Sequence, residues 1–495
     1  MTTPTGNKII DSVLWGGWKW VNTTGAPVHL TYAFSDTYST WLTAEKTAFR
    51  QALKAFSKVS KISFSEVSNE SDANLLEHAL TNAQMSTGSG ITLGRHEPPE
   101  YATVNSSGVW QEDGYYNWEA WSYPSNGLGY DSTGLVKGGY GFTTILHELG
   151  HALGLGHPHD TSGGVGFLMP TVSSPTDYGD KNLNQGLFTV MSYNRGWADV
   201  QDPRGNNLSA YGYNKGLSAL DIAAIQYLYG ADRKSNDGNS TYILKDKGSW
   251  MAIWDTGGVD TIRYDGWGDA VINLASATLT NKVGGGGMPS YIKNSATESY
   301  YGGYTIAGDL MNVLRNKASE RGVIIENANG GYGDDVLKGN SVGNRLVGFF
   351  GDDRLFGKDG NDTLSGNNGD DRLVGGKGHD KLFGGNGKDL ISAGGGADVL
   401  KGGRGWDTLT GGAGQDAFHF GSSEGRDTIT DFGNDFDTLM LSRSLWSGHL
   451  TKAQVVNRFA DAVGGKVVFT FDGGEVLKVE GVSNPNALID DIVFT

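Results

Sequence analysis

Residues 348–383 read GFFGDDRLFGKDGNDTLSGNNGDDRLVGGKGHDKLF, which is four copies of the nine-residue pattern G-G-x-G-x-D-x-U-x, where U is a large apolar residue. The register continues in both directions and gives ten consecutive nonapeptides over residues 330–419. The glycine-rich half predicts a turn, because glycine adopts backbone conformations that other residues avoid. The x-U-x half predicts a short strand with one inward apolar side chain, so two nonapeptides make one coil of a parallel β-roll.

The sixth position of the nonapeptide indicates why such a roll needs a cation. It is aspartate in nine of the ten copies and Asn344 in the second. Successive coils stack these carboxylates, so that Asp353 faces Asp371, and like charges at that spacing need a cation between them. Calcium prefers carboxylate and carbonyl oxygens. We therefore predict a roll that is largely unfolded without calcium, with several ions held by Asp335, Asp353, Asp362, Asp371, Asp380, Asp389, Asp398, Asp407 and Asp416.

A second motif lies upstream, where residues 147–157 read HELGHALGLGH. On a helix, His147 and His151 share one face and can bind one ion. Gly154 lets the chain turn away from the helix, so that His157 reaches the same ion. Three neutral imidazoles leave a position open for water, which is the arrangement of a catalytic zinc site. Glu148 is then placed to take a proton from metal-activated water as a general base.

Composition excludes several other classes of protein. The chain has 495 residues, with 77 glycines, 11 prolines and no cysteine. The absence of cysteine excludes disulfides, a thiol nucleophile and cysteine-ligated metal. The net charge of −16 argues against nucleic acid as the main partner. No apolar run approaches the length of a membrane span, and the length predicts about two to four domains.

A third signal, FTVMSY at residues 188–193, points to a family. Met191 lies where metzincins have the Met-turn beneath their metal. Together with the histidine motif and the nonapeptides, it makes the chain resemble a serralysin, a secreted bacterial metzincin protease with an RTX β-roll. The resemblance runs from about Lys8 to the end and includes residues 217–230, which resemble the family's last catalytic-domain helix. Their apolar spacing also predicts an amphipathic helix.

This resemblance implies a fold, a cofactor set and a reaction. The fold is an α+β zincin domain of the metzincin type followed by an all-β parallel β-roll. One catalytic zinc is held by His147, His151 and His157. Tyr193 is a further zinc ligand in the resting enzyme and stabilises the oxyanion during catalysis. Glu148 is the general base of peptide-bond hydrolysis, while Met191 and Gly154 have structural roles.

The substrate is expected to pair as an added strand with an edge strand of the catalytic domain. Residues 101–104 are one candidate for that strand, and an ordinary interior strand is an equal alternative. The expected domains are an N-terminal extension at 1–18 (which in the family can hold a short propeptide), a catalytic domain at 19–233, connecting strands and loops at 234–329, the roll at 330–419 and a C-terminal β cap at 420–495.

The two ends of the chain bear on export. The N-terminus lacks the apolar core of a conventional signal peptide. The C-terminal residues 490–495, DDIVFT, resemble the signal read by type I secretion systems, although they also predict a final β-strand. We expect an extracellular bacterial monomer without a transmembrane segment. Its partners would be protein or peptide substrates, the type I secretion machinery and, as a further partner, a protein inhibitor, but no nucleic acid.

Two rival functions were weighed against the protease. A non-enzymatic RTX adhesin would not need the complete ligand set with Glu148 and Tyr193. The other rival is a different RTX enzyme, such as a lipase or a polysaccharide lyase. A lipase would need G-x-S-x-G on a strand-to-helix turn, whereas residues 339–343 lie inside a nonapeptide and residues 421–425 just follow the last one. The loops 160–187 and 281–304 look particular to this chain.

Overall fold

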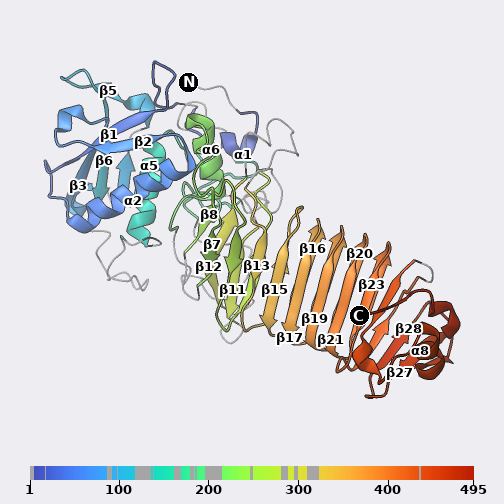
Figure 1. Cartoon of the computed structure of the whole chain (residues 1–495). Coiled ribbons are helices and arrows are strands. Elements are labelled where there is room, and N and C mark those ends of the chain that lie inside the picture. The colour runs from blue at the N-terminus through green and yellow to red at the C-terminus, as the bar shows by residue number, and fades with distance from the viewer. Residues whose placement is uncertain are drawn as a thin grey trace.

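A computed structural model shows an elongated molecule, with a mixed α/β domain at one end and two long sheets running away from it (Figure 1). The expected fold class is confirmed. The loops 160–187 and 281–304 lie partly outside the described residues. The structure describes residues 5–16, 18–85, 92–96, 98–117, 135, 137, 139–160, 169–178, 183, 185, 187–194, 214–245, 249–279, 288–294, 299–308, 323–433 and 436–495.

The N-terminal domain is built on one sheet with the strand order β2-β1-β3-β6-β4, and β5 pairs with β6 as well. The first four strands of that order run parallel, whereas β4 and β5 run antiparallel to β6. The bounds are β1 (His29–Ser35), β2 (Ser63–Glu66), β3 (Leu75–Leu80), β4 (Gly94–His96), β5 (Thr103–Val104) and β6 (Trp110–Asn117), with η1 (Glu70–Asp72), α3 (Asn82–Met85) and η2 (Pro99–Tyr101) between them. The sheet therefore ends, among the described strands, at the short antiparallel strand β4.

The three longest helices among the described residues of this domain are α2, α5 and α6. Helix α2 (Thr43–Val59) is amphipathic and buries Phe49, Leu53 and Phe56 at a spacing of three to four residues. Helix α5 (Tyr140–Ala152) carries the histidine motif and packs against α2 and β4. The prediction of an amphipathic helix over residues 217–230 is wrong, because ten of the eleven residues of α6 (Ala219–Tyr229) are buried. That helix lies inside the domain, enclosed by α1, α2 and β8, and has no solvent face to be polar.

The N-terminal segment is part of this domain's packing. Helix α1 (Lys8–Asp11) buries Ile9 and Ile10 in the core. Leu14 then forms an antiparallel bridge with Leu155, between the second and third histidines of the motif. Gly154 has φ +92, and a side chain there would collide with the carbonyl oxygen of Trp18. The segment that was expected to be an extension thus packs directly against the histidine-bearing loop.

The nonapeptides form the predicted roll. Each strand pairs in parallel with the strand two nonapeptides away, as Leu346 does with Leu364 and Leu364 with Leu382. The eighth-position side chains are at most 1% exposed, so they make the core between the sheets. The ten-stranded sheet contains β7 (Thr241–Ile243), β9 (Thr261–Arg263), β13 (Asn327–Asn329), β15 (Arg345–Phe350), β17 (Thr363–Asn368), β19 (Lys381–Gly387), β21 (Val399–Gly405), β23 (Ala417–Phe420), β25 (Thr438–Leu441) and β29 (Ile492–Phe494).

The opposite sheet has thirteen strands in the part of the chain that the structure describes. They are β8 (Met251–Ile253), β10 (Asp269–Asn273), β11 (Ser290–Asn294), β12 (Ser299–Ile306), β14 (Val336–Lys338), β16 (Arg354–Asp359), β18 (Arg372–Lys377), β20 (Leu390–Gly395), β22 (Thr408–Ala413), β24 (Arg426–Ile429), β26 (Ala460–Val463), β27 (Lys466–Thr470) and β28 (Val476–Val479). Both sheets therefore extend beyond the nonapeptides at each end, into residues 234–329 and 420–495.

The far end of the roll is covered by α8 (Lys452–Phe459), η3 (Arg443–Leu445) and η4 (Pro485–Leu488) (Figure 1). Trp446, Phe459 and Phe471 pack together there, with ring centroids 5.3–6.3 Å apart. The last residues form strand β29, which pairs with β25. Among the described residues, no helix is long and apolar enough to cross a bilayer.

Candidate metal and catalytic centre

Three histidine side chains meet beside helix α5. His147 Nε2 lies 3.0 Å from His157 Nε2, and His151 Nε2 lies 3.1 Å from the same atom. The two helical histidines come from successive turns, and the chain reversal at Gly154 returns His157 to them. These three residues form the group of metal-ligand side chains that the described part of the chain brings together.

The histidines are oriented for metal binding by their other nitrogens. His147 Nδ1 donates to the carbonyl oxygen of Val190 at 2.8 Å, and His151 Nδ1 donates to that of Leu155 at 2.9 Å. Each Nε2 then carries a lone pair toward the centre of the group. Burial lowers the pKa of His147 to about 4 and that of His151 to about 3, so both imidazoles are neutral. Lone pairs this close repel one another unless a cation lies between them, so the donor set fits zinc.

Glu148 is buried on the side of the helix that faces β4. An added side chain at Gly94 would lie 2.6 Å from Glu148 Cγ, so the glycine lets the strand backbone approach the carboxylate-bearing chain. Burial raises the pKa of Glu148 to about 7, and the charge and backbone hydrogen bond of His96 act in the opposite direction. In turn, His96 Nε2 lies 3.3 Å from Glu77 Oε1, and both side chains are fully buried.

The turn around Met191 packs against the helix that carries His147 and His151. Met191 is fully buried, and its sulfur occupies the space that a side chain at Gly150 would need, with Sδ 2.5 Å from that position. Asp221, near the start of α6, accepts hydrogen bonds from Thr189 Oγ1 and from the backbone N–H of Val190, at 2.5 and 2.9 Å. Because Val190 also accepts from His147, Asp221 fixes the turn that orients a metal-binding histidine.

Tyr193 and His159 border the same centre. The Tyr193 ring centroid lies 4.7 Å from that of His157 and 5.6 Å from that of His147, and 56% of the residue is exposed. His159 stacks on His157 with centroids 5.1 Å apart. His159 is therefore a packing neighbour of His157.

The sixth-position aspartates of the roll form two buried columns. In each column, one carboxylate oxygen accepts the backbone N–H of the aspartate one coil earlier, as Asp371 Oδ1 does from Asp353 at 2.8 Å. The other oxygen is buried and makes no hydrogen bond among the described residues, from Asp353 through Asp416. Burial and neighbouring carboxylates raise the pKa of Asp353 to about 9 and that of Asp371 to about 7. A row of unpaired buried oxygens fits a divalent cation between coils.

Asn344, the one sixth-position residue that is not aspartate, has a structural explanation. The columns of aspartates also continue beyond the last nonapeptide. The amide of Asn344 accepts from Asn340 N at 2.7 Å and donates to the Glu326 carbonyl at 3.0 Å, so it satisfies the position without a cation. Asp427 and Asp437 continue the two columns past the last nonapeptide, since they accept from Asp407 N and Asp416 N. The nonapeptide pattern does not predict these two aspartates. Extra residues lengthen the separation from the preceding aspartate of the column from 18 residues to 20 for Asp427 and 21 for Asp437.

Comparison with known proteins agrees with this geometry. The matrixin family model matches residues 19–183, and the RTX calcium-binding nonapeptide repeat model matches residues 347–382 and 383–418. A serralysin from Photorhabdus laumondii is 32% identical over 325 residues, covering 62% of this chain and 57% of that protein. A serralysin from Proteus mirabilis is 30% identical over 326 residues, covering 61% of this chain and 55% of that protein. Metalloprotease AprA of Pseudomonas entomophila is 28% identical over 359 residues, covering 66% and 62%.

The chain spans little more than half the length of the serralysins it matches. It is serralysin-like, with a matrixin-type domain that carries a three-histidine zinc site and with RTX repeats that bind calcium.

Proposed function

We propose that this chain is a zinc-dependent endopeptidase that hydrolyses peptide bonds in extracellular proteins, with Glu148 as the general base. The observation that carries the proposal is the buried Glu148 carboxyl, next to the three converging imidazoles and against the edge strand β4. Zinc bound by the three histidines supplies a Lewis acid that polarises the scissile carbonyl and acidifies water. A non-enzymatic adhesin would have no use for this arrangement.

Glu148 moves the protons of the proposed reaction. A carboxyl group with a pKa near 7 can accept a proton from the attacking water and return it to the leaving amine nitrogen. Tyr193, whose ring lies beside those of His147 and His157, donates a hydrogen bond from its hydroxyl to the oxyanion in this proposal. Met191 and Gly154 act through packing, by supporting the helix and by turning the chain toward His157.

The substrate strand is assigned to β4, at the edge of the described sheet. This strand ends the described sheet and lies against Glu148, and an extended peptide can add to it by backbone hydrogen bonds. The earlier candidate, residues 101–104, is less suitable, because Thr103 and Val104 pair with Gln111 and Trp110 in a hairpin. Secretion through a C-terminal signal, the monomeric state and the domain divisions at residues 18, 233, 329 and 419 are parts of the same proposal.

Replacing Glu148 with glutamine tests the general base. Glu148→Gln should lower casein hydrolysis by at least about 100-fold, because the amide cannot accept the proton. Metal analysis should find the zinc content of the variant unchanged. A variant with normal zinc and near wild-type turnover would exclude Glu148 from this role.

The role of Tyr193 is tested separately. Tyr193→Phe should lower kcat about 10- to 100-fold with little change in KM, since the hydroxyl is assigned to the oxyanion and not to substrate binding. Tyr101→Phe, at another exposed tyrosine, serves as the control and should behave as wild type. Equal kinetics for the two variants would remove Tyr193 from the mechanism.

A further inference from the structure

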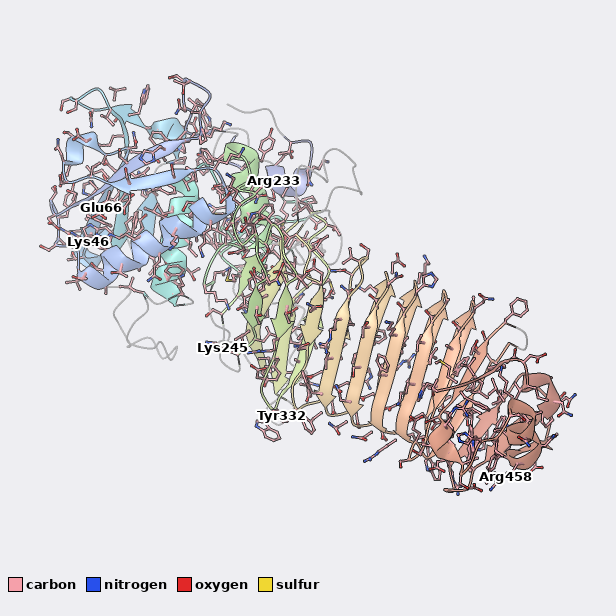
Figure 2. All side chains as sticks on the ribbon, viewed as in Figure 1. Lys46, Glu66, Arg233, Lys245, Tyr332 and Arg458 are labelled. Atoms are coloured by element: carbon pink, nitrogen blue, oxygen red, sulfur yellow. The ribbon has the colours of Figure 1, made fainter. Side chains whose placement is uncertain are left out.

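The outer face of the ten-stranded sheet carries a ladder of exposed side chains that calcium binding does not use. Its members occupy the third position of alternate nonapeptides and are therefore 18 residues apart, one on each coil. From the catalytic end the ladder consists of Tyr332, Phe350, Asn368, Asn386 and Arg404. Trp267, which is 80% exposed, stacks on Tyr332 with centroids 4.4 Å apart, and Tyr332 stacks on Phe350 at 5.2 Å. Figure 2 shows Tyr332 projecting from the edge of the roll.

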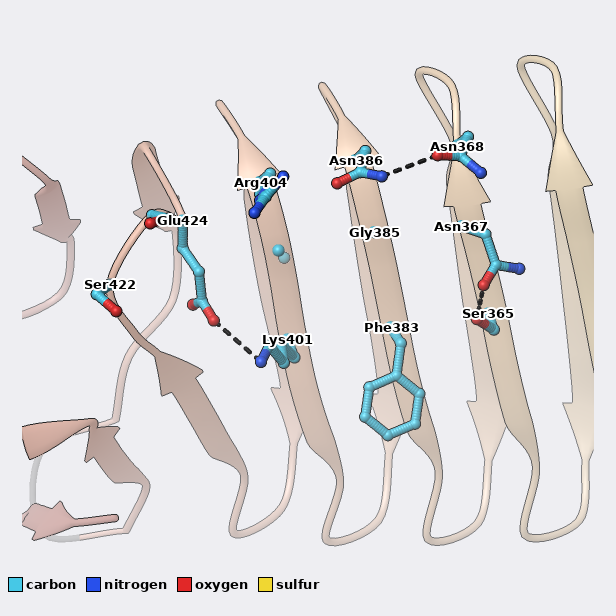
Figure 3. A pocket seen from close by; sticks show the side chains of 13 residues that line it. Ser365, Asn367, Asn368, Phe383, Gly385, Asn386, Lys401, Arg404, Ser422 and Glu424 are labelled. Atoms are coloured by element: carbon cyan, nitrogen blue, oxygen red, sulfur yellow. Dashed lines mark hydrogen bonds and ion pairs between the residues drawn. The ribbon is translucent and has the colours of Figure 1, made fainter. Parts of the chain in front are cut away.

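A groove of about 570 Å³ lies beside the polar half of this ladder (Figure 3). Its floor is bare sheet at Gly385 and Gly403, positions where the preceding coils carry Phe349 and Asn367. Asn368, Asn386 and Arg404 form one wall, and the other side holds the ring of Phe383 (Figure 3). The hollow thus results from glycine at two successive coils, and its volume lies in the usual range of ligand sites.

The polar groups of the groove are fixed in place. Lys401 Nζ lies 3.0 Å from Glu424 Oε1, and the other oxygen of this buried carboxylate accepts the Gly421 N–H at 2.7 Å. Asn386 Nδ2 donates to Asn368 Oδ1 at 2.8 Å, which holds the two amides in one row. The buried Nδ2 of Asn367 has no hydrogen-bond partner among the described residues. Arg404 is exposed and forms no ion pair with another described residue.

These groups select one class of ligand. Aromatic rings pack against the C–H faces of sugars, while amides and a guanidinium hydrogen-bond pairs of hydroxyls. Exposed Asp334, Asp352 and Asp370 lie beside the ladder on the coils of Tyr332, Phe350 and Asn368 and would repel an acidic polymer there, whereas Lys388 takes this position on the next coil. An extended peptide would need a free strand edge, whereas β17, β19 and β21 are paired on both sides.

We propose that this face of the roll binds a neutral polysaccharide, which lies along the ladder from Trp267 to Arg404. Neighbouring coils are about 4.8 Å apart, so Trp267 and the five ladder residues together extend over about 24 Å. That length accommodates several sugar units, with the aromatic rungs at one end and the amide and guanidinium rungs at the other. The site is independent of the zinc centre and would hold the protein on a glycan surface whether or not it cleaves peptides.

Affinity electrophoresis of the full chain with calcium tests the proposal. The gels contain soluble hydroxyethyl cellulose, galactomannan or starch as neutral polymers, or alginate as an acidic one. We expect retardation by at least one neutral polymer and none by alginate. The double variant Asn386→Ala/Arg404→Ala should raise the apparent Kd at least tenfold. The single variant Tyr332→Ala should do the same.

Lys377→Ala is the matched control, because Lys377 occupies the same third position on the opposite sheet and makes only a long, exposed ion pair. It should bind as wild type. Calcium-dependent circular dichroism checks that all variants keep the roll. The proposal is overturned if no neutral polymer retards the protein, if alginate alone does, if a casein peptide competes for the retardation, or if the ladder variants and Lys377→Ala behave alike.

Discussion

At the scale of single residues, a glycine lies against the proposed general base and leaves no room for a side chain. Gly94→Ala would bring a methyl group within 2.6 Å of Glu148 Cγ, so either β4 or the carboxylate must shift. Because a displacement of about 1 Å can cost 100-fold in rate, we expect kcat for casein to fall by about 10- to 100-fold with zinc retained. Gly395→Ala, at a glycine with open space around it, should leave kcat unchanged. A normal kcat for Gly94→Ala would mean that the strand is free to move.

The sequence predicts those site residues that lie close to one another along the chain. His147, Glu148 and His151 lie on adjacent turns of one helix and His157 follows after one reversal, so the spacing alone predicts their convergence. Gly94, His96 and Glu77 reach the same place from other strands, 50 to 70 residues away. No local period connects them to the helix. Their proximity is decided by the pairing of β4 with β6, which single-sequence periodicity does not encode.

At the scale of elements, one carboxylate joins helix α6 to the Met191 turn. Asp221→Ala removes the acceptor for Thr189 Oγ1, Val190 N and Ser218 N. Because supporting partners of metal-binding histidines affect metal affinity by about 10- to 100-fold, zinc should bind correspondingly more weakly. Unsatisfied buried donors should also lower the free energy of unfolding by about 2–4 kcal/mol. Competition with a chromogenic chelator measures the first effect, and Asp237→Ala, at an exposed position, is the control. Unchanged zinc affinity would contradict the coupling.

The N-terminal segment gives a second prediction at this scale. Ile10→Ala removes a side chain that is fully buried in the core and should cost about 2–5 kcal/mol of unfolding free energy. Urea denaturation of the purified full chain measures this, and Lys8→Ala, at an exposed position of the same helix, should have little effect. If residues 1–18 are instead a propeptide that is removed, N-terminal sequencing of the active protein will find them absent. In that case Ile10→Ala will leave stability unchanged.

At the scale of the whole molecule, the roll could be read from the sequence and its ends could not. A period of nine residues fixes the coil, the core positions and the acidic columns, because every coil repeats the contacts of the one before it. The strands in residues 234–329 and 420–495 belong to the same sheets but lack the period, so they read only as connecting and capping segments. The glycan ladder also needs the coil register, since residues 18 apart become neighbours only once the roll is built.

The acidic columns make the folding of the whole roll depend on pH in opposite ways with and without calcium. Without the cation, folding raises the pKa of Asp353 to about 9 and that of Asp371 to about 7, from 3.8. A carboxyl group with a raised folded pKa gives stability through its bound proton, which is complete below about pH 4 and is lost as the pH rises through 7 to 9. In calcium-depleted buffer the roll should therefore be largely unfolded near pH 8.5, and near pH 5 it should give a larger β signal that melts at a higher temperature.

With calcium in excess the order should reverse, because protons compete with the cation for the same oxygens. Circular dichroism melting in resin-depleted buffer and in millimolar calcium measures both curves, and they should converge as the pH falls. Asn344→Asp supplies the matched test, because it replaces an amide that satisfies its position without a cation. The added carboxylate should reduce the β signal that remains near pH 8.5 in depleted buffer and have little effect near pH 5. The opposite result would be a melting temperature without calcium that falls as the pH falls. It would mean that the columns are charged in the folded state and that cation binding is not what holds the coils together.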